Sequence, residues 1–357
     1  PVMMVGWALA LYAMIRATEA GDWRWWALCG LAIGAGTLAK YTMLAFAGGA
    51  LGYGLFSARG RDLRGAAVAA GAAALAILPN VLWNARHSFA TVTHVAEDAA
   101  PGGGMWNPGN LAEFLGAQAG VIGPVFLAGI AVAFLRRRAW AGDPRMRLMA
   151  WQTAPLLGGM ILLAFATRAQ PNWAAPAYVA GAIMAARMLL LLDWRRALLW
   201  GQGALGAAAA LALWGTAALY EARATDLPRG PDPFKKMRLA EPVCSRALGA
   251  LAEEGAEVLL SDNRRRLSEC MFLGGLGWDQ VAVWNPDRLI DNHHELVASL
   301  HPGDDRLMLL AVLGEGRGAA LAARFREARE VDAGRFATHA DRDFSYSLWV
   351  VRGFEGY

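Results

Sequence analysis

Eight long runs of apolar residues fill most of the first 220 residues and restrict how this chain can fold. A helix needs about 20 apolar residues to cross a bilayer, and a helix also satisfies its own backbone groups there. Small residues such as Gly30 and Gly34 allow close helix packing in lipid. The runs cover residues 2–15, 24–39, 41–57, 66–84, 110–135, 148–167, 173–192 and 197–219. We therefore predict a polytopic α-helical membrane protein with about eight spans.

Composition and charge divide the chain in two. Hydrophobic residues make up 56% of it, and it contains 15 Trp, which is too apolar for an ordinary soluble protein. Residues 1–220 carry 16 Lys and Arg against 8 Asp and Glu, a net of +8, whereas residues 221–357 carry 18 against 22, a net of −4. We predict a transmembrane domain over 1–220 and a soluble domain over 221–357. The positive excess lies in short loops between apolar runs, so we expect no nucleic-acid partner.

The basic residues lie in alternate connections between the runs and predict an orientation. Cytoplasmic loops of membrane proteins are enriched in Lys and Arg. One set of connections holds Arg16, Arg24, Arg59, Arg61, Arg64, Arg136, Arg137, Arg138, Arg145, Arg147, Arg195 and Arg196. The alternate set holds only Lys40, Arg86 and Arg168. We therefore expect the first set to be cytoplasmic, and the second set and everything after about residue 220 to face outward.

Lys40 is the only charged residue between Trp25 and Ser57, and it lies where the second run meets the third. A lysine at the membrane interface costs little, because its ammonium can reach the headgroups. Interface lysines usually flank a span, however, whereas a further apolar run follows Lys40 at once. Ionisable residues inside membrane segments commonly serve function. We favour a cation that lines a cavity and keep the interfacial lysine as the alternative.

The other outward segments are unusually polar. Residues 78–99 carry Asn84, Arg86, His87, His94, Glu97 and Asp98, and residues 168–178 (RAQPNWAAPAY) form a short turn. Arg, His and Lys on one side of the membrane suit a phosphate, because all can donate hydrogen bonds to its oxygens. Taken singly, Trp83 and Trp173 also fit aromatic anchors at the interface, and His87 fits a solvated loop residue.

The C-terminal residues 228–357 predict a small α/β domain. Strand-like runs at 257–261, 280–284, 306–313 and 346–351 alternate with helical stretches at 239–254, 264–273 and 316–329. This order indicates a compact sheet covered by helices. Three histidines occur in one polar segment, and we interpret them as solvated side chains rather than as metal ligands: His293, His294 and His301.

The chain has three cysteines. Cys29 lies within a predicted span, where it behaves as a small apolar residue. Cys244 and Cys270 both lie in the outward domain, where an oxidising compartment permits a disulfide. The sequence leaves open whether their Cα atoms come close enough to bond.

Four blocks in the membrane part carry a resemblance to a known family. They read GLAIGAGTLAKYTML, LPNVLWNARHSFATVTH, NLAEFLGAQAGVIGPVFL and QPNWAAPAY, and LLSDNRRRLSECMFL continues the likeness into the soluble domain. In this order they resemble the bacterial glycosyltransferase family 39 proteins of the GT-C superfamily. That family includes relatives of the protein O-mannosyltransferases and of the lipid A aminoarabinose transferase. The likeness covers the whole chain and does not specify the sugar.

The resemblance implies a membrane glycosyltransferase of the bacterial inner membrane, with a periplasmic C-terminal domain, that acts in cell-envelope glycosylation. Such enzymes move a sugar from a polyprenyl phosphate to a lipid, glycan or protein acceptor on the outer face. An acidic base takes the proton of the acceptor hydroxyl, and cations or a divalent metal stabilise the leaving phosphate. Lys40, Arg86 and His94 are then the candidates for the phosphate. The candidates for the sugar or acceptor pocket are Tyr41, Asn84, His87, Gln118, Gln170, Asn172 and Trp173.

The chain departs from the family at its start. In the family the acidic motif lies in the first outer loop, which would precede Pro1, so we expect a fragment that lacks this loop and its helices and is inactive alone. The catalytic base is therefore unassigned. Glu97 and Asp98 do not match the missing motif. We expect them at most to hold other site residues in place without contacting the substrate.

Two other functions fit part of the sequence. A secondary transporter or lipid flippase also uses polar residues in apolar helices, but it predicts repeats between halves and polar groups at mid-membrane. A non-catalytic membrane anchor that presents a periplasmic binding domain tolerates the missing carboxylate, but it leaves the polar outer loops unexplained. The clustering of polar groups on one side favours the transferase.

Overall fold

The computed structural model divides into two compact units, Pro1–Ala207 and Ala208–Tyr357. We call them the helical unit and the sheet unit, and each is described by itself. The structure describes residues 2–57, 61–86, 89, 107–167, 169–290 and 292–357. The division falls inside one long helix, α10 (Arg195–Arg223), which coincides with the last predicted apolar run.

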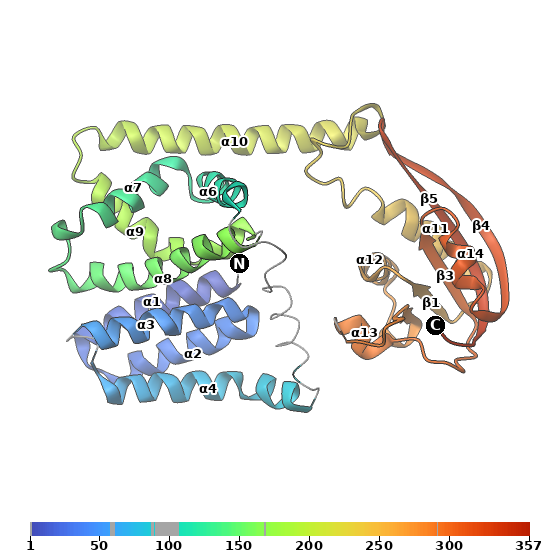
Figure 1. The fold of residues 1–357 in the computed structure, drawn as a ribbon, viewed down its shortest axis with the longest axis horizontal. Helices are drawn as coiled ribbons and strands as arrows, with labels where there is room; N and C mark the ends of the chain where they lie inside the picture. Colours follow the sequence, from blue (N-terminus) through green and yellow to red (C-terminus); the bar gives the residue numbers. More distant parts are fainter. Residues whose placement is uncertain (1, 58–60, 87–88, 90–106, 168, 291) are drawn as a thin grey trace. The chain divides into compact units, whose positions relative to one another are not determined.

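Every predicted apolar run in the helical unit forms helix. The elements are α1 (Val2–Ala20), α2 (Trp23–Ala39), the 3-10 turn η1 (Tyr41–Met43), α3 (Leu44–Phe56), α4 (Leu63–Arg86), α6 (Pro108–Ile122), α7 (Pro124–Leu135), η3 (Arg137–Ala139), α8 (Pro144–Ala166), η4 (Pro171–Ala174), α9 (Ala177–Leu189) and the start of α10. Figure 1 shows these helices running back and forth, so that the α2–η1 junction, the end of α4 and the α8–η4 connection lie toward one end of the unit. The ends of α1, α3 and α7 lie toward the other end. These two ends match the two sets of connections that the basic residues separate.

Helices α2 and α4 pack closely because their facing residues are small. A Cβ atom added to Gly30 would lie 2.1 Å from the carbonyl oxygen of Ala69, and one added to Gly34 would lie 2.5 Å from Cβ of Ala76. Neither position has room for a larger side chain. The close helix approach predicted for Gly30 and Gly34 is therefore confirmed.

The count of eight spans is not confirmed. By length and composition, four helices among the described residues could cross a membrane, namely α1, α4, α8 and the helix that begins at Arg195, and a fifth if α6 and α7 count as one. The apolar run over 110–135 is not one straight helix, since α6 and α7 are bent by 110°. Pro124 lacks the N–H that would continue the helix, and Gly123 adopts φ 89°. The side-chain oxygen of Gln202 from α10 accepts the freed N–H of Val125 at 3.1 Å.

The sheet unit contains one five-stranded mixed sheet in the order β2-β1-β3-β5-β4. Its elements after α10 are η5 (Ala224–Asp226), α11 (Ala240–Glu253), β1 (Val258–Ser261), α12 (Arg264–Gly274), η6 (Trp278–Gln280), β2 (Val281–Val283), α13 (His293–Ala298), β3 (Met308–Leu313), α14 (Arg317–Ala322), β4 (Phe325–His339) and β5 (Arg342–Phe354). Strands β1, β2 and β3 are parallel, with Leu259 opposite both Val281 and Leu309. Strand β5 runs antiparallel to β3 and to β4.

Side chains alternate across this sheet and form a core on each face. Leu259 and Leu309 belong to one core with Cys244, Leu267 and Cys270 of the helices α11 and α12. The other core combines Val258, Leu260, Leu310 and Phe325 with Phe354 near the end of the chain. Strands form at all four predicted positions. The predicted α/β character of this part of the chain is therefore confirmed.

The predicted helix over 316–329 is wrong in its second half. Helix α14 ends at Ala322, and residues from Phe325 onward form strand β4. Strand β4 pairs with β5 from Phe325 opposite Phe354 to His339 opposite Arg342. The Ala, Arg and Glu residues of this segment favour a helix locally, but the long antiparallel ladder overrides that preference.

Cys244 of α11 and Cys270 of α12 form a disulfide, with their Cα atoms 5.0 Å apart. The bond closes a loop of 26 residues between two helices on the same face of the sheet. A cross-link of this length stabilises a fold by about 3 kcal/mol. Cys29 is buried in the helical unit as a free thiol, as expected for a small apolar residue.

Candidate functional site

A chain of polar side chains links the α2–η1 junction to the last turns of α4. The hydroxyl of Tyr41 donates to Oδ1 of Asn80 at 2.7 Å. One helical turn further along, Nδ2 of Asn84 donates to the backbone oxygen of Asn80 at 3.0 Å and lies 3.3 Å from its Oδ1. Residues four apart share one face of a helix, so both amides project toward α2. We call Tyr41, Asn80 and Asn84 the amide string.

Asn84 carries a polar atom whose bonding capacity is unmet. Its side chain is 3% exposed, and among the described residues its Oδ1 has no hydrogen-bond partner. An amide oxygen can accept two hydrogen bonds. Leaving such a buried acceptor unpaired costs about 1–3 kcal/mol. Native proteins tolerate few such groups, and each one needs an explanation.

Lys40 lies at the break between α2 and η1, next to the amide string. Helix α2 ends at Ala39, and Lys40 adopts an extended backbone with φ −165° while its N–H still donates to Gly36 O at 3.0 Å. Its side chain is exposed, and within the part of the chain that the structure describes it forms no ion pair. Arg86 is also exposed and ends α4, two residues after Asn84. Lys40 thus directly precedes Tyr41 of the amide string in the chain, whereas Arg86, two residues after Asn84, lies on another face of α4.

The second group of predicted residues surrounds η4. Gln118 of α6 is fully buried, and its Nε2 donates to Phe114 O at 3.2 Å and to Pro171 O at 3.3 Å. The hydroxyl of Tyr178 donates to its Oε1 at 2.7 Å. Gln118 is predicted to line a pocket, and in the structure these bonds tie α6, η4 and α9 together.

Beside this buried amide, the η4 turn presents polar groups to the surface. Gln170 and Asn172 are exposed, and Trp173 is half-buried. The backbone N–H of Trp173 donates to the backbone oxygen of Gln170 at 3.0 Å. A pocket of about 160 Å³ lies beside the turn and is lined by Asn110, Glu113, Phe114, Ala169, Gln170 and Pro171. It is too small for a whole sugar–lipid, but it offers carboxylate and amide groups at one wall.

Four predicted residues lie outside the described residues, namely His87, His94, Glu97 and Asp98. The sequence analysis in turn missed Asn80, which contacts two predicted residues at once. One signal could have found it. Asn80 and Asn84 are two amides four residues apart in an otherwise apolar helix, and that spacing places them on one face.

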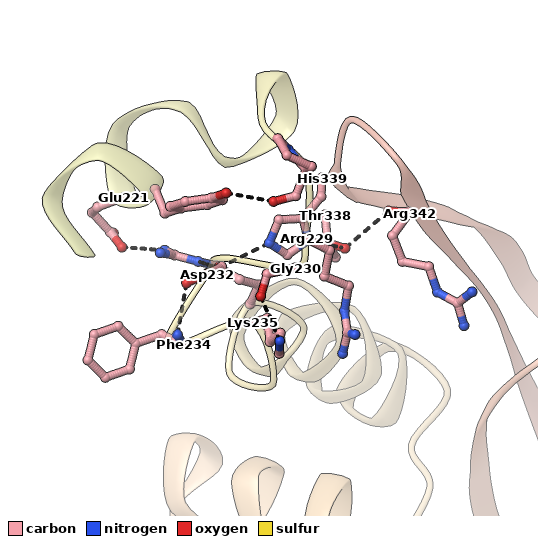
Figure 2. Close-up of polar contacts among 12 residues, drawn as sticks. Glu221, Arg229, Gly230, Asp232, Phe234, Lys235, Thr338, His339 and Arg342 are labelled. Atoms are coloured by element: carbon pink, nitrogen blue, oxygen red, sulfur yellow. Dashed lines mark hydrogen bonds and ion pairs between the residues drawn. The ribbon is translucent and has the colours of Figure 1, made fainter. Parts of the chain in front are cut away.

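The sheet unit contains a different buried polar cluster, which was not predicted. Figure 2 shows Asp232 between the end of α10 and the tip of the β4–β5 hairpin. Its Oδ2 accepts from Nε of Arg238 at 3.1 Å and lies 3.0 Å from Nε2 of His339, and its Oδ1 accepts from Phe234 N at 2.8 Å. Arg238 also pairs with Glu221 of α10. We call Glu221, Asp232, Arg238 and His339 the Asp232 cluster.

The Asp232 cluster has the properties of a structural lock. The side chains of Asp232 and His339 are both fully buried, and both carboxylate oxygens have donors. Burial by itself raises the pKa of Asp232, but hydrogen bonds from Phe234 N, Arg238 and His339 outweigh it and hold that pKa below its usual range. A ligand would find no open position on this carboxylate.

Comparisons with known proteins relate the chain to glycosyltransferases. The profile of the family described as Dolichyl-phosphate-mannose-protein mannosyltransferase matches residues 1–83. The lipid A galacturonosyltransferase RgtD of Rhizobium johnstonii is 31% identical over 272 residues, which is 74% of this chain and 55% of that relative. The chain thus spans about half the length of the curated relative that it matches. No solved structure matches it.

These findings confirm the resemblance to the GT-C glycosyltransferases that the sequence blocks indicated. The family match covers α1, α2, α3 and most of α4, and thus Lys40, Tyr41 and Asn80. With the apolar helices, it supports a membrane protein. Both matches are transferases by name.

Proposed function

We propose that this chain is part of a membrane glycosyltransferase that moves a sugar from a polyprenyl-phosphate donor to an acceptor at the outer face of the membrane. The observation that carries the proposal is the amide string beside Lys40. It consists of uncharged hydrogen-bonding groups, and its Tyr41 directly follows the exposed Lys40 in the chain, at one end of a helical unit that resembles GT-C enzymes. A phosphate and a sugar joined by one bond need these two kinds of partner.

In this reaction an acceptor oxygen attacks the anomeric carbon of the sugar. A new carbon–oxygen bond forms there while the bond from that carbon to the phosphate oxygen breaks, and its electron pair leaves with the lipid phosphate. The acceptor hydroxyl loses its proton to a base. Lys40 and Arg86, together with His94, would stabilise the charge that grows on the phosphate. The base remains unassigned, and Glu97 and Asp98 would support it through the surrounding loop.

The acceptor side of the reaction is assigned to the surface around η4. Gln170, Asn172 and Trp173 offer amides and an indole beside the small pocket at Asn110 and Glu113. The relative RgtD is named for transfer to lipid A, and a lipid acceptor is accordingly the class that we propose first. A glycan or a protein acceptor would use the same surface groups.

We place the sheet unit in the periplasm of a bacterial inner membrane. The basic residues favour this orientation through the positive-inside rule. The disulfide between Cys244 and Cys270 supports it, because such bonds persist in oxidising compartments. Assignment to glycosyltransferase family 39 is part of the same proposal.

Binding of sugar-linked polyprenyl phosphate in lipid vesicles tests the proposed role of Lys40. A charge-assisted contact with a phosphate contributes about 1.5–3 kcal/mol, so Lys40→Ala should weaken binding about tenfold or more. Arg64→Ala is the matched control, because Arg64 is an exposed cation at the opposite end of α4. Equal losses in the two variants would show that Lys40 acts only as part of the general charge.

A further inference from the structure

We propose that Oδ1 of Asn84 accepts a hydrogen bond from a hydroxyl of the sugar on the lipid-linked donor. The amide string would then recognise the sugar, while Lys40 binds the phosphate. This inference rests on the proposed function and extends it to the part of the donor that each residue contacts. It assigns Asn84 and Asn80 to substrate specificity rather than to charge neutralisation.

The orientation of the Asn84 amide follows from its neighbour. Its Nδ2 lies 3.0 Å from the backbone oxygen of Asn80, which can only accept a hydrogen bond. Rotating the amide by half a turn would set two acceptors against each other. Oδ1 is therefore the atom that lacks a partner among the described residues, and it is buried.

The chemistry of this oxygen selects its ligand. An amide oxygen only accepts hydrogen bonds, and the oxygens of an ionised phosphate also only accept them. The phosphate of the donor is thus excluded from Asn84. The polyprenyl chain is apolar and has no donor to offer. Among the parts of a polyprenyl-phosphate sugar, only the hydroxyl or amino groups of the sugar can fill the unmet position.

The geometry brings the two halves of the donor to the residues that suit them. Tyr41 follows Lys40 in the chain, and its hydroxyl holds Asn80 at 2.7 Å. Asn80 in turn holds Asn84. A phosphate bound by Lys40 would therefore bring its attached sugar to the same end of the α2–α4 pair as the two amides. Tyr41 positions the amides relative to the cation.

The unpaired oxygen alone would not carry this inference. Gln152 of α8 is also buried, with its Nε2 bonded to Phe46 O at 3.2 Å, and its Oε1 likewise has no partner among the described residues. Gln152, however, contacts α3 at Phe46 rather than the junction at Lys40. The combination of an unmet acceptor with a neighbouring cation distinguishes Asn84, and it makes Gln152 a matched control.

The test compares two kinds of probe on the protein in lipid vesicles. One is polyprenyl phosphate without a sugar, and the other is polyprenyl phosphate linked to a hexose or to a hexuronic acid. We expect Asn84→Ala to weaken binding of a sugar-linked probe about tenfold, as the loss of a hydrogen bond to a recognised hydroxyl does. Binding of the sugar-free probe should stay unchanged, and Gln152→Ala should change neither.

The outcomes separate this inference from the proposed function. If Asn84→Ala weakens both kinds of probe equally, or neither, the sugar contact is wrong, and a buried water then explains the unpaired oxygen. The same conclusion follows if Gln152→Ala reproduces the sugar-specific loss. If Lys40→Ala leaves both kinds of probe unchanged, the phosphate site itself is wrong. Thermal unfolding of Asn84→Ala checks that the variant folds, and Asn84→Leu provides a second variant of similar volume.

Discussion

Two buried polar side chains, Asp232 in the sheet unit and Asn84 in the helical unit, differ in how far the fold satisfies them. In the sheet unit, Asp232 is fully buried and both of its oxygens have donors. In the helical unit, Asn84 is 3% exposed, yet its Oδ1 lacks a partner among the described residues. Both groups cost free energy to desolvate, but only the first recovers that cost within the fold. Burial alone therefore does not distinguish a structural residue from a ligand-binding one, and an unmet hydrogen-bonding position becomes informative only beside a second feature such as the neighbouring Lys40.

The surroundings of the two residues agree with this distinction. Asp232 joins three segments distant in sequence, since it contacts Arg238 nearby and His339 across 107 positions, while Arg238 reaches Glu221. Such a closed network favours one arrangement of the chain. Asn84 instead ends a string whose other end, Tyr41, follows the exposed Lys40 in the chain. The first network is closed, whereas the second keeps an unmet acceptor at Asn84 among the described residues.

The largest effect should come from opening the closed network. Asp232→Ala leaves the buried His339 and Arg238 without their carboxylate, and removing one member of a buried pair costs about 3–5 kcal/mol. We expect a loss near 3 kcal/mol, because Arg238 keeps Glu221. Pulse proteolysis of the whole protein, with cleavage sites mapped to the sheet unit, measures it. Asp226→Ala is the control, since Asp226 forms only an exposed pair with Arg223 and should change stability by less than about 1 kcal/mol. Equal losses of stability in Asp232→Ala and Asp226→Ala would contradict the structural role of the Asp232 cluster.

A smaller effect should appear in acid. The pKa of Asp232 is lower in the folded chain than the ordinary value of 3.8, so between these two pKa values its carboxyl binds fewer protons in the folded chain than in the unfolded one. Its contribution to stability is complete above pH 3.8 and is lost as the pH falls through the folded pKa. The sheet unit should thus lose stability below about pH 4. In Asp232→Asn the stability of the sheet unit should fall less steeply below pH 4 than in the unmodified protein. An equally steep fall in the variant would assign the acid response to other carboxylates.

The smallest effect on stability should come from replacing the Asn84 amide with an apolar side chain. Asn84→Leu removes an unpaired buried acceptor and replaces it with apolar volume, so the helical unit should change in stability by less than about 1 kcal/mol. Binding of the sugar-linked probe should nevertheless fall. Thermal unfolding in detergent measures the stability of both Asn84→Leu and Asn80→Leu. Asn80→Leu should be the less stable variant, because it removes the acceptor of the Tyr41 hydroxyl. A large destabilisation by Asn84→Leu would mean that its amide already holds the fold together.

The sequence was informative where the cause of structure is local. Long apolar runs become helices, so all eight were located, and paired glycines indicated the contact between α2 and α4. The sheet unit was recognised from runs of β-branched and aliphatic residues. The predicted helix over 316–329 failed because residues from Phe325 onward are held by β5, a partner that local composition does not reveal. The bend at Gly123 was missed although the following Pro124 was visible in the sequence.

The site was harder to predict than the fold, since it depends on contacts between distant residues. Lys40 and Asn84 could be proposed from their unusual place in apolar runs. The spacing of Asn80 and Asn84 in an apolar helix is visible in the sequence, but the bond from Tyr41 to Asn80, across 39 positions, is not. The Asp232 cluster also depends on distant contacts, and neither Asp232 nor His339 is unusual in its own segment. Gln118 stays a predicted pocket residue, and its bonds to Pro171 and Tyr178 became visible only in the structure.

The tight contact between α2 and α4 also fixes the spacing of the residues in the amide string. Ala76 meets Gly34 with no space for a methyl group, and Asn80 lies one turn beyond Ala76 on the same helix. The distance over which Tyr41 must reach Asn80 is therefore set by atoms that touch no substrate. Gly34→Ala would fit only if α4 moved away from α2, and that movement would carry Asn80 and Asn84 with it. Selection on substrate choice would then leave its mark in the packing of two helices, at positions that a search for polar residues passes over.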